Sequence, residues 1–76
     1  MEDRELLART IQAEAGNQGY DGKYHVGSVI RNRVDSGNYG DGYRGVIMKP
    51  GQFSAWNLAT GYADGEQGQD MDNLHV

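Results

Sequence analysis

The sequence predicts a mainly α-helical fold, in which two packed helices are followed by a glycine-rich loop region with a short extended segment. Two observations carry this prediction. Apolar residues recur every three or four positions in the first half of the chain, which is the period of an amphipathic helix. Glycine, of which the chain has 12 against one proline, interrupts the second half. With 76 residues and no cysteine, the chain has room for one small domain and no disulfide framework.

The first predicted helix spans residues 2–15. Leu7, Ile11 and Ala15 repeat at the four-residue spacing that places apolar side chains on one helix face. The acidic residues at its start favour the helix, because the amino end of the helix dipole is positive. Gly16 is expected to follow as the C′ residue, the position where helices commonly end in a left-handed conformation.

A polar connection over residues 16–22 leads to the second predicted helix, with Asp21 placed to cap it. Val26, Ile30 and Val34 again lie four residues apart on one face. Gly37 is expected to end this helix. Since the connection is short, we expect the two helices to pack against each other, either antiparallel or at a steep angle.

Beyond the second helix the pattern weakens. Residues 38–45 are expected to form a loop, residues 46–48 one helical turn or a strand fragment, and residues 50–51 the centre of a type II turn. Residues 52–58 are expected to be extended. Residues 60–76 contain too few apolar side chains to build a core, so they are predicted to form a polar, acidic tail.

Composition excludes several classes of function. The chain has 7 Lys+Arg against 11 Asp+Glu, a net charge of −4, which argues against a nucleic-acid-binding protein because such proteins need a basic surface. No apolar run has the length of a membrane span, and the first residues do not resemble a signal peptide. His25 and His75 are isolated and cysteine is absent, so no metal site and no cofactor are predicted.

Glu14 stands out because it shares the apolar face of the first helix, three residues after Ile11 and seven after Leu7. It also lies in the last turn, where the dipole disfavours negative charge. Burial, the dipole and apolar neighbours all raise the pKa of a carboxyl group, and an acid that stays protonated near neutral pH can act as a general acid. In the alternative, which the pattern alone favours, Glu14 reaches solvent at the edge of the stripe or ties down the next loop.

A second candidate is the segment 52–57, in which aromatic rings alternate with amide and hydroxyl groups. That mixture binds sugars, because sugar rings stack on aromatic faces and hydroxyl groups bond to amides. In the alternative, Phe53 is a core residue and Trp56 partly covers the core. The pattern favours the core position for Phe53, and for Trp56 it favours neither sugar binding nor partial burial. Arg33 shares a face with apolar residues, so we expect it to fix a loop carbonyl or a carboxylate.

The chain contains the stretch LARTIQAEAGNQGYDGKYHVGSVIRNRV and, after a loop, GVIMKPGQFSAW. In order and spacing, these two stretches resemble the motifs of the SleB-like cell-wall hydrolases, over about residues 6–57. This family includes the spore cortex-lytic enzymes. The resemblance implies a compact α+β relative of the lysozyme and lytic-transglycosylase fold. It also implies a catalytic core over residues 1–59, with residues 60–76 as the end of an incomplete domain.

The resemblance places the catalytic glutamate of the family on Glu14. It implies cleavage of the β-1,4 bond after N-acetylmuramic acid in peptidoglycan, usually with a 1,6-anhydro product. The glycan strand is therefore the expected partner, and no metal or cofactor is implied. The expected substrate-binding residues are Tyr20, Gln52, Phe53, Ser54, Trp56 and Asn57.

Two departures from the family pattern leave alternatives open. The Gly-Glu pair usual after the catalytic segment is missing, since Asn17 follows Gly16, and residues 60–76 lack the helix and aromatic stretch usual at that point. We therefore expect a phage-type minimal version or a fragment that acts on the bacterial cell wall and is completed by a virion or other protein partner. Beside a lytic transglycosylase, a hydrolytic muramidase and a non-catalytic peptidoglycan-binding module stay open.

Overall fold

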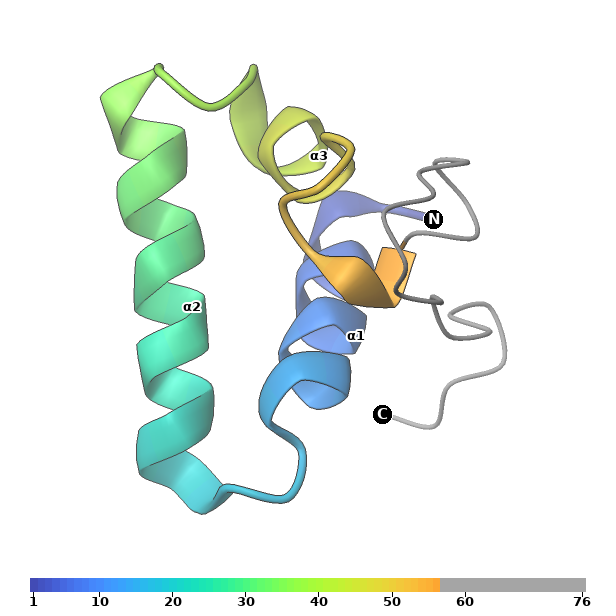
Figure 1. Cartoon of the computed structure of the whole chain (residues 1–76), viewed down its shortest axis with the longest axis vertical. Helices are drawn as coiled ribbons and strands as arrows, with labels where there is room; N and C mark the ends of the chain where they lie inside the picture. The colour runs from blue at the N-terminus through green and yellow to red at the C-terminus, as the bar shows by residue number, and fades with distance from the viewer. Residues whose placement is uncertain (57–76) are drawn as a thin grey trace.

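The fold of the described chain is mainly helical, as the sequence predicted. A computed structural model describes residues 1–56, in the order α1 (Asp3–Ala15), α2 (Gly19–Ser36), α3 (Gly42–Ile47) and the 3-10 turn η1 (Ser54–Trp56) (Figure 1). Within residues 1–56 there is no strand. Asn57 and the predicted tail over residues 60–76 lie outside the described residues. No helix among residues 1–56 combines the length and the apolar character needed to cross a membrane.

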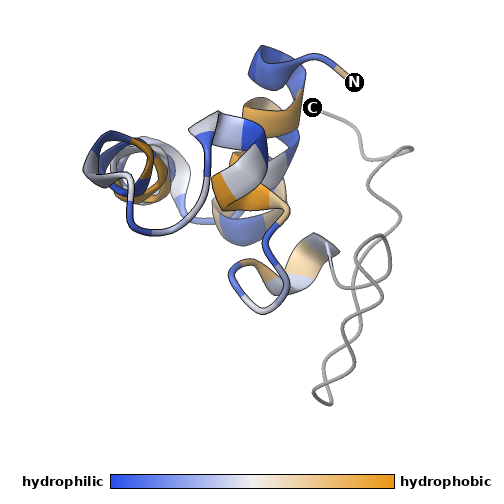
Figure 2. Ribbon diagram, turned by 90° about the horizontal axis from the view of Figure 1, so that it is seen from above, coloured by the Kyte–Doolittle hydropathy of each residue, from blue (hydrophilic) through white to orange (hydrophobic). Residues whose placement is uncertain are grey.

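The two long helices pack against each other and cross at a steep angle, one of the two predicted arrangements. Figure 2 looks down the axis of α2, whereas α1 is seen from the side. The short helix α3 contacts both long helices, and η1 contacts α1. The apolar side of α2 faces the other helices, and the polar residues lie on the outside (Figure 2). The core therefore sits where the helices converge.

The connection between α1 and α2 is tighter than the sequence predicted. Gly16 has a φ of −60° and is right-handed, so the predicted left-handed end of α1 is wrong. The Gln18 amide donates to the Ala15 carbonyl (3.1 Å), and α2 begins at Gly19, whose φ is +77°. Because α2 starts this early, Asp21 lies within its first turn and does not cap it. The left-handed glycine needed to turn the chain is Gly19.

The predicted end of α2 is confirmed. Gly37 adopts the left-handed conformation (φ +73°), and its amide donates to the Val34 carbonyl (3.3 Å). The Ser36 hydroxyl donates to the Arg33 carbonyl (2.8 Å) and accepts from the Asn38 amide (3.2 Å). These bonds satisfy backbone groups that the end of a helix would otherwise leave without partners.

Two segments of the second half differ from the prediction. Residues 42–45 were expected in a loop but form the start of α3, because a helix there buries Val46 and Ile47 completely. Residues 52–58 were expected to be extended, but residues 54–56 form η1, where the Trp56 amide donates to the Phe53 carbonyl (3.1 Å). The predicted turn between them is confirmed: Gly51 has a φ of +84°, and the Gln52 amide donates to the Lys49 carbonyl (3.1 Å).

Trp56 joins the end of the described chain to α1. Its ring is 5% exposed and packs in the core with apolar residues of α1, α2 and α3. The indole Nε1 donates to the hydroxyl of Thr10 (2.9 Å), which is fully buried and itself donates to the Leu6 carbonyl (2.7 Å). Both buried polar groups are therefore hydrogen-bonded, as burial requires.

Gly40 is a position where we expect a methyl group to destabilise the fold. Its φ is +147°, and a Cβ there would lie 2.6 Å from the carbonyl oxygen of Gly45. We expect Gly40→Ala to lower the free energy of unfolding by about 1–3 kcal/mol, measured by urea unfolding. Gly37→Ala is the control, because its φ is also positive but open space surrounds it. Equal losses for the two variants would mean that the contact with Gly45 contributes nothing.

Candidate active site

A pocket of about 350 Å³ opens between α1, α2 and the turn that precedes η1. It brings together Glu14, Gln52 and Phe53, three residues that the sequence analysis selected and that lie in two distant stretches of the chain. α1 supplies Glu14, and the turn supplies the other two. The remaining lining residues come from α2: His25, Val26, Val29 and Arg33.

Glu14 lies in the last turn of α1 and lines this pocket rather than a fully exposed surface. The residue is half-buried, and its Oε1 atom is shielded from solvent. The same helix face carries Leu6 and Thr10, which are fully buried. The helical spacing thus placed the carboxyl group correctly, at the border between the core and an open pocket.

Arg33 holds Gln52 in one orientation. Its Nη1 donates to the amide oxygen of Gln52 (2.9 Å), and its guanidinium lies 5.2 Å from the Tyr39 ring centre and 5.7 Å from the Phe53 ring centre. The sequence analysis expected a carbonyl or carboxylate as the partner of Arg33, and the partner is a side-chain amide. A guanidinium can only donate, so the amide oxygen faces it and the NH₂ group of Gln52 points elsewhere.

The remaining predicted substrate-binding residues are not gathered in this pocket. Trp56 is a core residue, and so is more deeply buried than either the substrate-binding role or the partly buried cover that the sequence left balanced. Tyr20 is 78% exposed and stacks on Tyr24, so it belongs to a different part of the surface. Ser54 is half-buried in η1 and is not among the described residues that line the pocket. Asn57 lies outside the described residues.

Sequence reasoning missed that one stripe of α2 lines the pocket. His25, Val29 and Arg33 lie four residues apart, so they share a helix face. That spacing was available in the sequence, but His25 was considered only as a metal ligand. Among residues 1–56, no group of three or more histidine, aspartate or glutamate side chains is placed to hold a metal ion. The pocket offers a carboxyl group, an imidazole, an oriented amide and an aromatic ring, which is a set suited to acid–base chemistry on a polar ligand.

Comparison with known proteins identifies the family. The family model described as Cell Wall Hydrolase matches residues 17–73 and begins just after Glu14. No solved structure matches the chain.

Three curated relatives are spore cortex-lytic enzymes. Those of Oceanobacillus iheyensis and Halalkalibacterium halodurans are each 38% identical to this chain over 53 residues, and that of Bacillus subtilis is 36% identical over the same length. These matches cover 70% of this chain but 19%, 16% and 17% of the relatives, so the chain spans less than a fifth of their length. The family match takes in most of the chain, and this protein belongs to the cell wall hydrolase family.

Proposed function

We propose that this chain cleaves the β-1,4 bond after N-acetylmuramic acid in peptidoglycan, as a lytic transglycosylase with Glu14 as its single catalytic carboxyl group. One observation carries the proposal: within residues 1–56, Glu14 is the sole acidic side chain lining the pocket that also contains Gln52 and Phe53. Family membership and the similarity to spore cortex-lytic enzymes support the substrate class.

The proposed reaction uses one carboxyl group twice. Protonated Glu14 donates its proton to the glycosidic oxygen while the C1–O bond breaks and an oxocarbenium-like centre develops at C1 of the muramyl sugar. The Glu14 carboxylate then accepts the proton of the C6 hydroxyl of the same sugar, whose oxygen bonds to C1 and closes the 1,6-anhydro ring. Glu14 ends protonated as it began, and no water is consumed.

The walls of the pocket suit a sugar. Phe53 offers an aromatic face on which the apolar side of a pyranose ring can stack. The amide NH₂ of Gln52, which does not face Arg33, can donate to a hydroxyl or acetamido oxygen of the glycan. Glu14 is half-buried, so a substrate can reach its carboxyl group while Oε1 is kept from bulk water.

A hydrolytic muramidase is the second candidate, and it needs either a second carboxylate or a held water. The acids that the sequence offers for this role are poorly placed, since Asp21, Asp35 and Asp41 are all exposed and none is among the described residues that line the pocket. Among residues 1–56, the other route to hydrolysis is a water held by Ser54 or Gln52, of which Gln52 lines the pocket. The position of these acids favours the transglycosylase.

The mass of the released fragments tests the proposal. The full chain is incubated with insoluble peptidoglycan, and the soluble muropeptides are analysed by mass spectrometry. We expect fragments lighter by one water than the corresponding reducing-end species. Reducing-end fragments would establish the muramidase instead. If a chain that circular dichroism shows to be folded released no fragments, a peptidoglycan-binding or virion module would be favoured. That a virion or other protein completes the domain stays a separate prediction.

Gln52→Glu tests the oriented amide. The new carboxylate can still accept from Arg33, so the fold should persist, but the NH₂ donor is lost. We expect binding of glycan oligomers to weaken about tenfold, which is the effect of losing one good hydrogen bond in a partly buried site. Calorimetric titration measures it. The control is Gln18→Glu, the same change at an exposed residue outside the pocket, and equal affinities for the two variants would remove Gln52 from substrate binding.

A further inference from the structure

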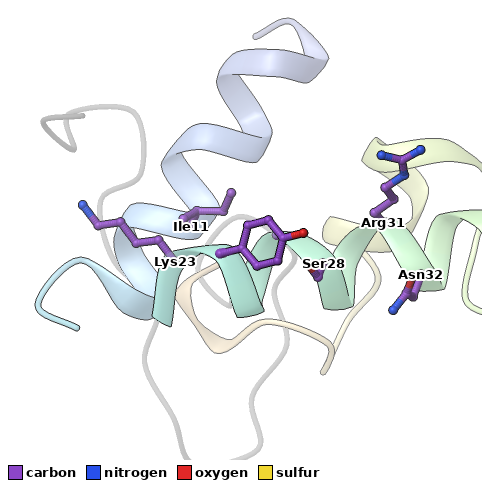
Figure 3. Close-up of a pocket in the computed structure, with 7 residues that line it drawn as sticks. Ile11, Lys23, Ser28, Arg31 and Asn32 are labelled. Atoms are coloured by element: carbon purple, nitrogen blue, oxygen red, sulfur yellow. The ribbon is translucent and has the colours of Figure 1, made fainter. Parts of the chain in front are cut away.

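A second pocket, of about 450 Å³, lies on another side of α2 (Figure 3). Lys23 and Arg31 project from α2 about two helical turns apart, and in this view Ile11 of α1 lies between them (Figure 3). The residues that line this second pocket are Ile11, Lys23, Tyr24, Gly27, Ser28, Arg31 and Asn32. The proposed reaction uses none of them.

Helical geometry separates the two pockets. Lys23, Gly27 and Arg31 form one stripe at four-residue spacing, and the stripe that carries His25 and Arg33 lies two residues further along. Two residues correspond to about 200° around a helix, so the stripes lie on opposite sides of α2. The two pockets therefore lie on different sides of α2, although Ile11 and Glu14, which line one each, are only three residues apart in α1.

The second pocket is cationic in a chain of net charge −4. Lys23 and Arg31 line it, and among residues 1–56 no acidic side chain does. Arg31 contacts Asp35, but at 3.8 Å and with 75% and 68% of the two side chains exposed, so this ion pair contributes little and can be exchanged for a ligand. Ser28 and Asn32 add a hydroxyl and an amide. These groups together suit a carboxylate with hydrogen-bonding groups around it.

An aromatic surface adjoins the cationic pocket. Tyr20 and Tyr24 stack with ring centres 6.0 Å apart and an angle of 27° between the rings, and they are 78% and 65% exposed. Tyr24 also lines the pocket. A contiguous exposed patch of large apolar side chains is typical of an interaction site. A ring face beside paired cations fits a ligand that joins a sugar to an acidic group.

We propose that the pocket of Lys23, Tyr24 and Arg31 is a second, non-catalytic binding site for a carboxylate-bearing glycopeptide, whose carboxylates bind the two cations and whose sugar stacks on the Tyr20–Tyr24 pair. The choice of a wall glycopeptide rests on the proposed function. A site of this kind holds a neighbouring segment of the wall while the Glu14 pocket acts on another. Simultaneous engagement of two sites strengthens attachment to a polymer without any change at the catalytic pocket.

Chemical-shift titration of the ¹⁵N-labelled full chain tests the site. The ligand is one disaccharide–tetrapeptide unit, GlcNAc joined to N-acetylmuramic acid with its peptide, which lacks the bond that the proposed reaction cleaves. We expect the largest shifts at the residues of α2 that line the second pocket and do not line the Glu14 pocket: Lys23, Tyr24, Gly27, Ser28, Arg31 and Asn32. Binding should be about tenfold weaker when the peptide carboxylates are converted to amides, because two ion pairs are lost. Neutral chito-oligosaccharide can stack on the tyrosines but carries no carboxylate, so it should bind about tenfold more weakly than the glycopeptide.

A matched pair of double variants locates the charge effect. Lys23→Gln/Arg31→Gln should bind the glycopeptide about tenfold more weakly, whereas Arg4→Gln/Lys49→Gln, which removes the same two charges at exposed positions elsewhere, should keep its affinity. Equal losses in both double variants, or equal binding of the amidated ligand, would overturn the proposal. Inorganic phosphate that saturates the site as tightly as the glycopeptide would also overturn it, in favour of a general anion site.

The outcome is independent of the catalytic proposal. A chain that binds the glycopeptide at the α2 residues of the second pocket but releases nothing from peptidoglycan overturns the proposed function alone. A chain that releases anhydro fragments but shows no shifts at these residues overturns the second site alone.

Discussion

Glu14→Gln is expected to abolish the release of muropeptides while leaving the helical fold intact. The amide has the shape of the carboxyl group but cannot donate the proton that the glycosidic oxygen needs, and general acid catalysis contributes about 10²–10⁴-fold in rate. Because the same group also accepts the C6 proton in the proposed reaction, the loss should lie at or beyond the upper end of that range. Release of soluble fragments from insoluble peptidoglycan, quantified by mass spectrometry, measures the effect.

Glu5→Gln is the matched control, because it makes the same substitution in the same helix. Glu5 forms an ion pair with Arg9 one helical turn away (2.8 Å), and such i,i+4 pairs contribute about 0.3–0.5 kcal/mol to stability. Circular dichroism should give the same helical signal for both variants. If Glu14→Gln kept most of the activity of the unchanged chain, Glu14 would not be the catalytic acid, and the search would turn to residues beyond the described part of the chain.

Trp56→Ala is expected to destabilise the protein by about 3–5 kcal/mol, the usual cost of truncating a buried tryptophan to alanine. A small domain is stable by about 5–15 kcal/mol, so this loss removes a large part of the total. At about 4–8 °C for each kcal/mol in a domain of this size, Tm should fall by at least about 12 °C. Thermal unfolding followed by circular dichroism measures the change.

Two further variants separate packing from hydrogen bonding at this position. Trp56→Phe keeps an aromatic ring but removes the Nε1 donor to Thr10, so it should cost less than Trp56→Ala. Tyr20→Ala, a change at a 78% exposed ring, should alter the free energy of unfolding by no more than about 0.5 kcal/mol. A Trp56→Ala variant with unchanged Tm but weakened glycan binding would return Trp56 to the substrate-binding surface.

The helices were predictable because their signals are local. The spacing of Leu7, Ile11 and Ala15 gives this segment an apolar face as soon as it is helical. A helix with such a face is stable when that face packs against the core. The end of α2 at Gly37 was predictable for the same reason, since glycine tolerates the left-handed conformation at no steric cost. By contrast, α3 contains Gly42 and Gly45, which are poor helix formers. It is helical because Val46 and Ile47 are buried there, and burial depends on the rest of the fold.

The candidate active site was predictable in part. The sequence selected Glu14, Gln52 and Phe53, and the structure gathers them in one pocket. The four-residue spacing of His25, Val29 and Arg33 placed His25 on one face with Arg33, but only the packing of α2 against α1 decides that this face lines the pocket.

The sequence by itself determined the family, the two long helices, and the unusual position of a carboxyl group on an apolar helix face, because each depends on residues close together in the chain. The tertiary structure alone decided that Trp56 is a core residue, that Arg33 orients Gln52, and that Tyr20 stacks on Tyr24 outside the Glu14 pocket. Trp56 and Thr10 are 46 residues apart in the chain, and Arg33 and Gln52 are 19 apart. Such contacts exist only after the helices have packed, since packing fixes which distant side chains share a pocket and which share the core.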